Sequence, residues 1–142
     1  MTNAAFISWA TDAGIDADTI GAIIDCASTT EQADAAFAAR EPGPPIFPLP
    51  QIVDLHDSDG YNMNPKSHGF VLIGYCPNGD SIAVDTDRDP GSIWYIGHET
   101  LGSVPLRENA VRVGDDLRSV YYSIEHDPDF PCDYYTARGQ CG

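Results

Sequence analysis

The sequence predicts an α+β fold, with a central antiparallel or mixed sheet and helices packed around it. Three apolar runs have the length and the β-branched and aromatic content of strands: residues 70–76, 81–84 and 92–96. Asn78-Gly79 separates the first two runs and is a strong hairpin signal, because both residues tolerate positive φ. Asp89-Pro90-Gly91 provides turn chemistry before the third run. We therefore expect a three-stranded antiparallel meander over residues 69–99.

The chain has 142 residues, a length typical of one domain, and we expect a single domain over residues 1–142. Its charge is unusual, because 22 Asp and Glu residues outnumber 7 Lys and Arg residues and give a formal net charge of −15. Such a charge argues against binding nucleic acid, which requires a basic surface for the phosphates. It suits a basic partner, a cation or simple solubility, and halophilic adaptation would give the same composition.

The N-terminal segment lacks a basic region followed by an apolar core, so it does not resemble a signal peptide. No apolar run approaches the roughly 18–20 residues that a membrane-spanning helix requires. We therefore expect a cytoplasmic protein with no membrane partner. The 4 cysteines form no CxxC pair, so the sequence signals neither a zinc site nor a redox motif. We interpret Cys26 and Cys76 as small buried hydrophobic residues.

Residues 1–40 are rich in alanine and predict three short helices that cover the sheet. Thr2 or Asn3 can cap the first helix and Gly14 can end it, while Asp16 can cap the second. Apolar residues repeat at helical spacing in both: Phe6, Trp9, Ala10 and Ala13 in the first, and Ile20, Ile23, Ile24 and Ala27 in the second. Overlapping capping boxes over residues 28–32 predict a third helix. A partner-binding helical hairpin is the alternative to a structural cover.

Residues 41–50 contain five prolines and predict an extended, semi-rigid connector within the domain. The core α+β unit then occupies residues 51–142, and we expect residues 52–55 to form a short strand. Near the other end of this unit, Gly114 is the expected cap of a C-terminal helix that ends near His126. Its inward stripe is Leu117, Val120, Tyr121 and Ile124. The aromatic segment 129–137 is expected to dock on the body.

A two-residue turn at Asn78-Gly79 fixes the expected register of the first hairpin. It predicts three pairs: Cys76 with Ser81, Tyr75 with Ile82, and Ile73 with Val84. One face of the hairpin then belongs to the core: Val71, Ile73, Tyr75, Ile82 and Val84. The opposite face is also mostly apolar, so we expect helices on one side of the sheet and the connector or the C-terminal segment on the other.

The sequence contains no recognisable catalytic or metal-binding motif. The loops over residues 57–65 and 85–91 are rich in Asp, but neither has the glycine and glutamate spacing of an EF-hand calcium loop. The 4 histidines stand singly, without the spacing of a helical metal pair. We therefore expect no enzymatic activity, no metal and no cofactor. An irregular oxygen-ligand cation site and an acid–base site assembled by the fold stay open as alternatives.

Three motifs carry a resemblance to a known family: Gly69-Phe-Val-Leu-Ile-Gly-Tyr-Cys-Pro-Asn-Gly-Asp80, Ser81-Ile-Ala-Val-Asp85 and Ile93-Trp-Tyr-Ile-Gly-His-Glu99. They resemble the SUKH superfamily of Smi/Knr-like domains, which are related to fungal cell-wall-synthesis regulators. The segment from Phe130 to Ala137 is similar to the closing segment of one bacterial branch. The resemblance covers residues 46–137, and the alanine-rich first 40 residues depart from the family pattern.

The resemblance implies an α+β fold without enzymatic activity. Many bacterial members are regarded as immunity proteins that bind and neutralise a cognate toxin, often a nuclease or a deaminase, and fungal members are signalling scaffolds. Asp80, Asp85 and His98 match positions of the family motif. Each has a structural interpretation, because Asp80 can bond the turn backbone and His98 can cap a strand end.

We therefore hypothesise that acidic loops at the rim of the sheet bind a basic toxin, with aromatic residues nearby as anchors. The candidate partner-binding residues are Asp57, Asp59, Asp80, Asp87, Asp89, Trp94, Tyr95, His98 and Glu99. Two alternatives stay open. One is a regulatory scaffold without a toxin partner, and the other is a small metal-dependent enzyme built on Asp and His residues.

Overall fold

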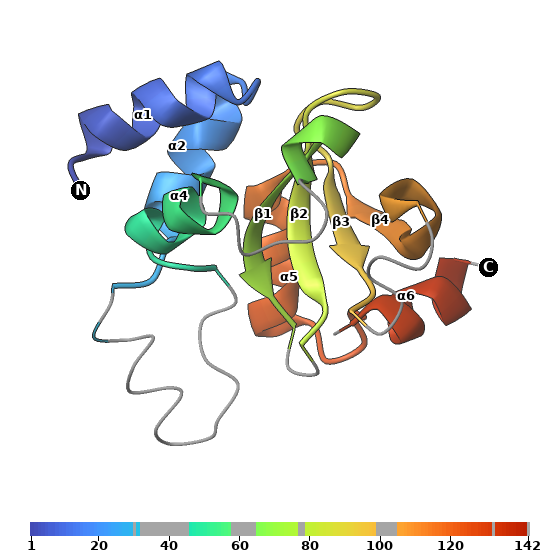
Figure 1. Cartoon of the computed structure of the whole chain (residues 1–142). Coiled ribbons are helices and arrows are strands. Elements are labelled where there is room, and N and C mark those ends of the chain that lie inside the picture. Colours follow the sequence, from blue (N-terminus) through green and yellow to red (C-terminus); the bar gives the residue numbers. More distant parts are fainter. Residues whose placement is uncertain are drawn as a thin grey trace.

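Four antiparallel strands lie at the centre of the computed structural model, in the order β1-β2-β3-β4 (Figure 1). Their bounds are Phe70–Tyr75 (β1), Ser81–Asp85 (β2), Ile93–Ile96 (β3) and Ala110–Gly114 (β4). The predicted meander is thus confirmed, and β4 extends it by a strand that the sequence analysis did not include. Helices pack against this sheet, so the α+β fold class is confirmed as well.

The structure describes residues 1–29, 31, 46–57, 65–76, 79–98, 105–131 and 133–141. Several predicted features lie outside these residues: almost all of the third helix, the first half of the proline-rich connector, and the Asp-rich loop after Asp57. Two of the candidate partner-binding residues, Asp59 and Glu99, also lie outside them.

The register of the first hairpin differs from the predicted one. Tyr75 pairs with Ser81 and Gly74 with Ile82, each one residue from expectation, and the register shifts again between Leu72 and Gly74. A two-residue turn was therefore the wrong assumption, because five residues separate the paired ends of the two strands. A bulge of this kind leaves one residue unpaired and cannot be derived from the turn alone.

The register change moves Tyr75 to a place that was not predicted and puts Cys76 in the main core. Tyr75, expected in the core, is 37% exposed and stacks on Phe47 with ring centroids 5.4 Å apart. Cys76 is instead buried in the main core, as its interpretation as a small hydrophobic residue requires. The backbone N–H of Cys76 donates to the carbonyl of Asp80 at 2.7 Å and closes the end of the hairpin.

The first two helices, α1 (Asn3–Asp12) and α2 (Ala17–Cys26), begin and end where local chemistry predicts. The Thr2 side chain accepts a hydrogen bond from the backbone of Ala5, and Asp16 accepts one from Thr19. Gly14 follows α1 with φ +93°, a conformation that glycine adopts without strain. The predicted inward stripes are buried or packed against the core.

The predicted strand over residues 52–55 is wrong, because this segment belongs to helix α4 (Leu49–Asp57). The carbonyl of Pro48 accepts hydrogen bonds from Gln51 and Ile52 and starts the helix. Pro50 sits in the first turn, where the missing N–H of proline has no intrahelical partner to lose. Ile52, Val53 and His56 then face inward at helical spacing. The connector is therefore not extended throughout, since its last two residues are helical.

The C-terminal part of the chain adds α5 (Leu117–His126) and α6 (Tyr134–Cys141). The cap of α5 is Asp116, whose side chain accepts from the backbone of Ser119 at 2.9 Å. The prediction of Gly114 as the cap is wrong, since Gly114 is the last residue of β4. The end at His126 is confirmed, and the aromatic segment docks as expected, because Tyr134 and Ala137 are buried in the core.

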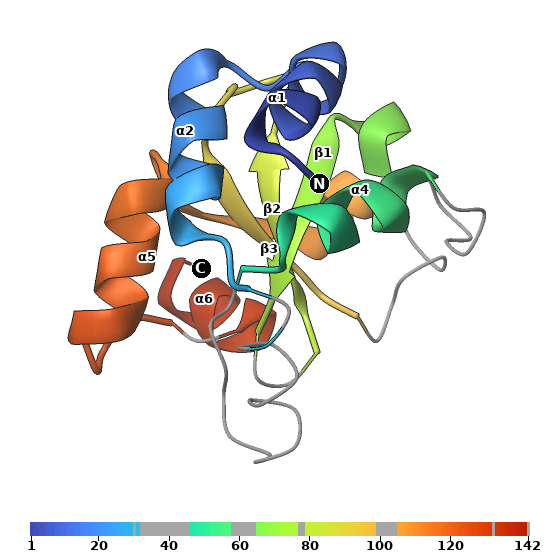
Figure 2. The same ribbon diagram turned by 90° about the vertical axis from the view of Figure 1, so that its left-hand side faces the viewer.

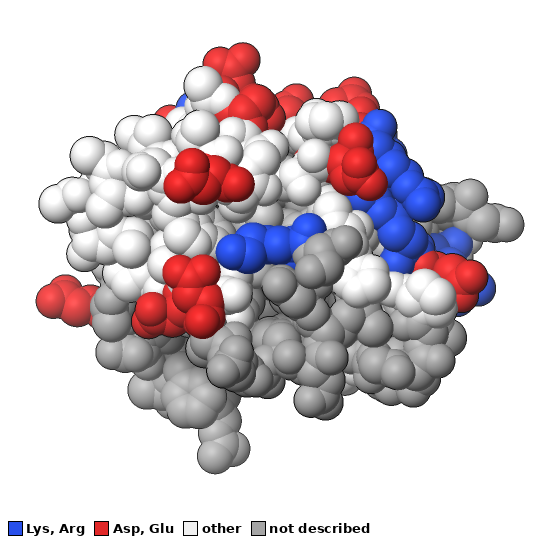
Figure 3. Space-filling view, turned by 45° about the horizontal axis from the view of Figure 1, so that its top comes forward, with Lys and Arg blue, Asp and Glu red and all other residues white. Residues whose placement is uncertain are grey.

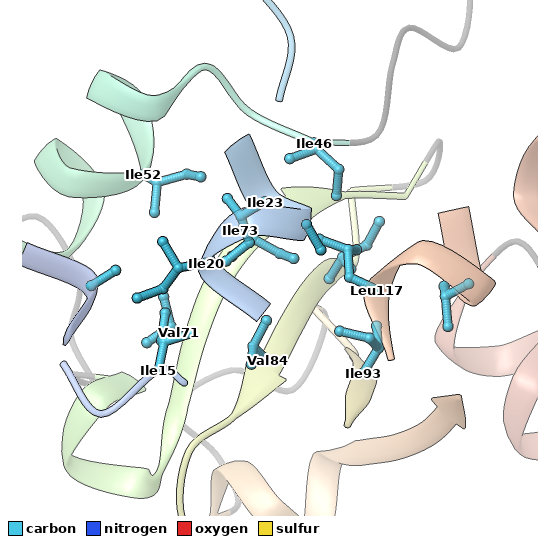
Figure 4. Close-up of a cluster of buried hydrophobic side chains, with 14 of the residues drawn as sticks. Ile15, Ile20, Ile23, Ile46, Ile52, Val71, Ile73, Val84, Ile93 and Leu117 are labelled. Carbon is cyan, nitrogen blue, oxygen red and sulfur yellow. The ribbon is translucent and has the colours of Figure 1, made fainter. Parts of the chain in front are cut away.

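The main core lies between one face of the sheet and the helices (Figure 4). Figure 2 shows α2 and α5 side by side along this face, with α4 at the β1 edge. Branched aliphatic side chains from every layer meet here: Ile15, Ile20, Ile23, Ile46, Ile52, Val71, Ile73, Val84, Ile93 and Leu117. Fully burying one such side chain contributes about 1.5–3 kcal/mol, so this face holds most of the hydrophobic stabilisation of the described residues.

A smaller apolar cluster covers the other face, which confirms that both faces are packed. It consists of Phe70, Leu72, Ala83, Ile96 and Leu106, with Leu55, Trp94 and Ala110 against it. Among the described residues, the cover comes from the short 3₁₀ helix η2 (Leu106–Asn109) and from Leu55 of α4, and not from the connector or the C-terminal segment. In the described part of the chain, no helix has both the length and the apolar character needed to cross a membrane.

Candidate functional site

The loop between β2 and β3 lies at the top of Figure 1, and the buried carboxylate of Asp85, the last residue of β2, organises this end of the sheet. Arg107 of η2 donates to both of its oxygens, with N–O distances of 2.8 Å and 2.7 Å. The Asp85 side chain is 0% exposed and that of Arg107 is 14% exposed. Burial opposes ionisation, but the hydrogen bonds from Arg107 and from the loop backbone outweigh it and lower the pKa of Asp85 to about 2. The carboxylate is therefore ionised and fully engaged.

The same carboxylate holds the loop between β2 and β3. The backbone N–H groups of Asp87, Arg88 and Asp89 donate to its oxygens at 2.9 Å, 3.2 Å and 3.3 Å. Three consecutive residues of an exposed loop are thereby tied to a charge inside the protein. The loop thus presents its exposed side chains from a fixed backbone.

Close packing of two glycines around this loop adds to the constraint. Gly69 has φ +82°, and a Cβ there would lie 2.6 Å from Cβ of Asp87 and 2.8 Å from Nη2 of Arg107. Gly91 has φ +91°, and a Cβ there would lie 3.2 Å from Oγ1 of Thr19 at the start of α2. Glycine is required at Gly69 by both backbone conformation and space.

Two of the predicted partner-binding residues, Asp87 and Asp89, are exposed on this loop. Asp89 pairs with Arg112 of β4 at 2.9 Å, and Arg112 also contacts Asp115 at 2.5 Å. These ion pairs are largely solvated, so each contributes little to stability. Figure 3 brings this end of the molecule forward and shows acidic side chains in separate groups on a mostly uncharged surface, with basic side chains in one group near the centre and a larger one at the right. The negative charge is thus distributed over this face and does not form one continuous patch.

Asp57 lies at the end of α4, where it already has partners. Its Oδ1 accepts a hydrogen bond from Nε1 of Trp9 at 3.1 Å and lies 3.6 Å from Nζ of Lys66. The Lys66 ammonium also lies 5.4 Å from the centroid of the Trp9 ring. Asp57 is exposed, yet its charge is partly neutralised by this contact with the only lysine.

The second motif aspartate, Asp80, occupies the opposite end of the sheet. Its Oδ1 accepts from the backbone N–H of His98 at 2.9 Å and lies 2.6 Å from the His98 ring nitrogen Nδ1. Its Oδ2 accepts from the backbone of Tyr134, the first residue of α6, at 3.0 Å. Asp80 is 0% exposed, so its carboxylate lies inside the protein and not at the surface. Instead it ties the β1–β2 connection to the end of β3 and to α6.

Of the two predicted aromatic anchors, one is inside the protein. Tyr95 is 1% exposed and donates its hydroxyl to the carbonyl of Pro131 at 2.9 Å, so it does not lie at the surface. Inward alternation along β3 explains this, because Tyr95 lies on the main-core face. Trp94 is half-buried on the other face, where Nε1 donates to Oγ of Ser92 at 2.8 Å.

The structure therefore does not gather the predicted site residues into one place. Asp87 and Asp89 lie before β3 and His98 lies after it, so the strand separates them. Sequence analysis also missed Arg107 and His56. His56 is buried, and its Nε2 accepts from the backbone of Leu72 on β1 at 2.9 Å. Both residues act on partners more than 15 residues away, and no local pattern encodes such contacts.

Among the described residues, no group of three or more His, Cys, Asp or Glu side chains is placed to hold a metal ion. A shallow cleft of about 350 Å³ lies between the first turns of α2 and α5, lined by Asp18, Thr19, Ala22, Asp116, Leu117 and Arg118. Comparison with protein-family models, with curated proteins and with solved structures gives no match for this chain.

Proposed function

We propose that this chain is a non-enzymatic protein-binding domain of the SUKH type, and that it is a cytoplasmic immunity protein. Its partner would be a basic bacterial toxin domain of the nuclease or deaminase class. The net charge of −15 supports a basic partner, because charge complementarity speeds encounter and gives specificity. The motifs of residues 69–99 support the family.

The observation that carries the proposal is the anchored loop between β2 and β3. Asp85 and Arg107 fix its backbone from inside, while Asp87 and Asp89 remain exposed on its outside. A binding loop that is ordered beforehand loses little conformational entropy when a partner arrives. A buried, fully bonded carboxylate under a short acidic loop is therefore well suited to present negative charge to a basic surface.

Asp87 and Asp89 are the residues that we assign to this contact. Asp57 lies near Trp9 and Lys66 and makes a weaker candidate, since its charge is already shared. Trp94 lies at the same end of the sheet and packs with Phe70 and Arg107. It therefore supports the loop indirectly, through Arg107. Asp59 and Glu99 stay predictions.

The test is capture of a partner from the native host with the full chain as bait. The Asp87→Asn/Asp89→Asn double variant removes two charges from the loop. Asp54→Asn/Asp127→Asn removes the same charge from exposed positions on α4 and after α5 and serves as the matched control. We expect a basic protein to bind the native chain and the control, and to bind the loop variant at least about tenfold more weakly, as loss of two charge contacts of about 1 kcal/mol each predicts. Equal binding to both variants, or recovery of only acidic proteins, would contradict the proposal.

Immunity and scaffold functions differ only in the partner. Expression of the captured protein in a heterologous host should arrest growth, and co-expression of the native chain should restore it. A captured protein that is harmless on expression would favour the scaffold alternative. The loop variant should rescue growth less well than the matched control.

The metal-dependent enzyme alternative makes a separate prediction. Equilibrium metal analysis of the purified chain would then find calcium, zinc or manganese in a stoichiometric amount. The binding-domain proposal predicts none, and a stoichiometric metal that is lost in Asp80→Asn or His98→Asn would overturn it.

A further inference from the structure

His98 is held by Asp80 through both its main chain and its side chain. The backbone N–H and the ring Nδ1 lie 2.9 Å and 2.6 Å from the same carboxylate oxygen. The other oxygen of Asp80 accepts from the first residue of α6. A side chain that is fixed in this way has lost most of its rotational freedom before any partner arrives.

The contact with Asp80 also determines which ring nitrogen carries the proton. A carboxylate only accepts hydrogen bonds, so Nδ1 must be the donor. In the neutral imidazole the other nitrogen, Nε2, then has a free lone pair and is an acceptor. Within the described part of the chain, no hydrogen bond reaches Nε2.

The two side chains of the pair differ in burial, with Asp80 inside the protein and His98 at the surface. The Asp80 side chain is 0% exposed, whereas the His98 side chain is 39% exposed. Of the two side chains, that of His98 reaches solvent, and the carboxylate that accepts from Nδ1 makes Nε2 a stronger hydrogen-bond acceptor. In this arrangement a buried carboxylate fixes the orientation and the tautomer of a histidine, so that its Nε2 can bond a group of another molecule.

Gly79 keeps the ring open on one flank. A Cβ at this position would lie 3.9 Å from the Cγ and Nδ1 atoms of His98, in van der Waals contact with the ring. Gly79 has φ +96°, so side chains are disfavoured here by backbone conformation as well. Gly79 thus approaches the imidazole and places no side chain over it.

We propose that His98 is a contact residue for the partner and accepts, through Nε2, a hydrogen bond from a Lys or Arg side chain. The inference rests on the proposed function for the basic character of the partner. It adds a second contact region at the opposite end of β3 from Asp87 and Asp89. The recognised group is a cationic N–H donor, and the geometry favours one directed donor over a diffuse positive surface.

The experiment uses the full ¹⁵N-labelled chain at pH 8 and a blocked hexa-arginine peptide as probe. Long-range ¹H–¹⁵N spectra first report the tautomer, and we expect a protonated Nδ1 and an unprotonated Nε2 at His98. The peptide is then titrated at about 0.15 M salt, where distant charges are screened. His126, which is 56% exposed on α5, is the internal reference. We expect the Nε2 resonance of His98 to shift saturably and by more than that of His126.

Two variants test whether the contact contributes to the affinity for the peptide. His98→Asn keeps an N–H that can bond Asp80 but removes the outer acceptor, and His126→Asn is the matched control. We expect His98→Asn to bind the peptide about threefold to tenfold more weakly, the effect of one hydrogen bond to a charged group, with an unchanged Tm. His126→Asn should bind as the native chain does.

Three outcomes would overturn the inference: a protonated Nε2, a His98 shift no larger than that of His126, or unchanged binding by His98→Asn. If His98→Asn unfolds, the ring shifts of the native chain decide alone. Capture of a partner that depends on Asp87 and Asp89 but not on His98 would reject this inference while leaving the proposed function intact.

Discussion

Arg107 and Asp85 form a bidentate ion pair next to the smaller apolar cluster, with N–O distances of 2.7 Å and 2.8 Å. The guanidinium carbon also lies 4.0 Å from the centroid of the Phe70 ring and 5.6 Å from that of Trp94. One cation thus serves the buried carboxylate, the aromatic cluster and, through Asp85, the loop that carries Asp87 and Asp89. This pair is the link between the fold and the proposed binding surface.

Removing the cation should be far more damaging than removing an exposed one. Arg107→Ala leaves the Asp85 charge buried without its counterion, which typically costs about 3–5 kcal/mol. Arg112→Ala breaks only the exposed contacts with Asp89 and Asp115 and should cost about 1 kcal/mol or less. Urea unfolding at pH 7 measures both. Similar losses in the two variants would mean that Asp85 does not depend on Arg107.

The ionisation of Asp85 should appear as a loss of stability in acid. Its pKa is lowered from 3.8 to about 2 in the folded chain, so the folded state favours the charged form. The resulting stabilisation, about 2 kcal/mol, is present above pH 4 and is lost as the pH falls from about 4 towards 2.

The Asp85→Asn variant lacks this titration, so its free energy of unfolding should fall less steeply below pH 4, although the variant is less stable than the native chain at pH 7. The measurement is the urea midpoint between pH 5 and pH 2 for both chains. Parallel curves would show that the carboxylate titrates alike in the folded and unfolded states.

Local patterns predicted the parts of the fold that depend on neighbours in sequence. Thr2 and Asp16 cap their helices by bonding residues three positions away, and the inward stripes repeat within single helices. The strand prediction for residues 52–55 failed because four residues are too few to separate periods of 2 and 3.6, and because prolines in a first helical turn are easily taken as helix breakers.

The candidate site was less predictable, because its contacts are made across the fold. Asp80 and His98 are 18 residues apart in sequence, and Asp85 and Arg107 are 22 apart. Each contact depends on the strand order and on the register of β2, β3 and β4. The motif identified three of these four residues, whereas Arg107 lies outside it and no sequence signal connects it to Asp85.

A second pH effect should come from His56, which is buried between α4 and β1. Burial lowers the pKa of His56, because the charged ring would be desolvated. Its Nδ1 lies 2.7 Å from the carbonyl of Ile52, and its Nε2 accepts from Leu72. Protonation would turn that acceptor into a donor facing another N–H group. The unfolded chain then binds the proton more readily, so stability present above about pH 6.5 is lost as the pH falls below it.

The His56→Gln variant keeps an acceptor for Leu72 without a titratable ring. We expect it to be about 1 kcal/mol less stable at pH 7, owing to the lost contact with Ile52. Its stability should change less than that of the native chain between pH 7 and pH 5. The other three histidines are common to both chains, so the difference isolates His56. A native chain with the same pH dependence as the variant would refute the buried, neutral state.

Gly69 and Gly79 offer a direct test of how tightly the loop between β2 and β3 is packed. Both residues have positive φ, +82° and +96°, so alanine at either position pays a backbone cost of about 1–2 kcal/mol. Only at Gly69 does a new Cβ overlap other atoms, namely Cβ of Asp87 and Nη2 of Arg107. At Gly79 the nearest atoms are those of the His98 ring, at ordinary contact distance. Gly69→Ala should therefore cost about 1–3 kcal/mol more than Gly79→Ala, the usual effect of overpacking.

Because the overlap falls on the loop and on its anchoring cation, hydrogen exchange at Asp87, Arg88 and Asp89 should also accelerate in Gly69→Ala and remain native in Gly79→Ala. Equal stability of the two variants, with unchanged exchange in the loop, would mean that Asp85 and Arg107 do not hold the loop as closely as their contacts imply.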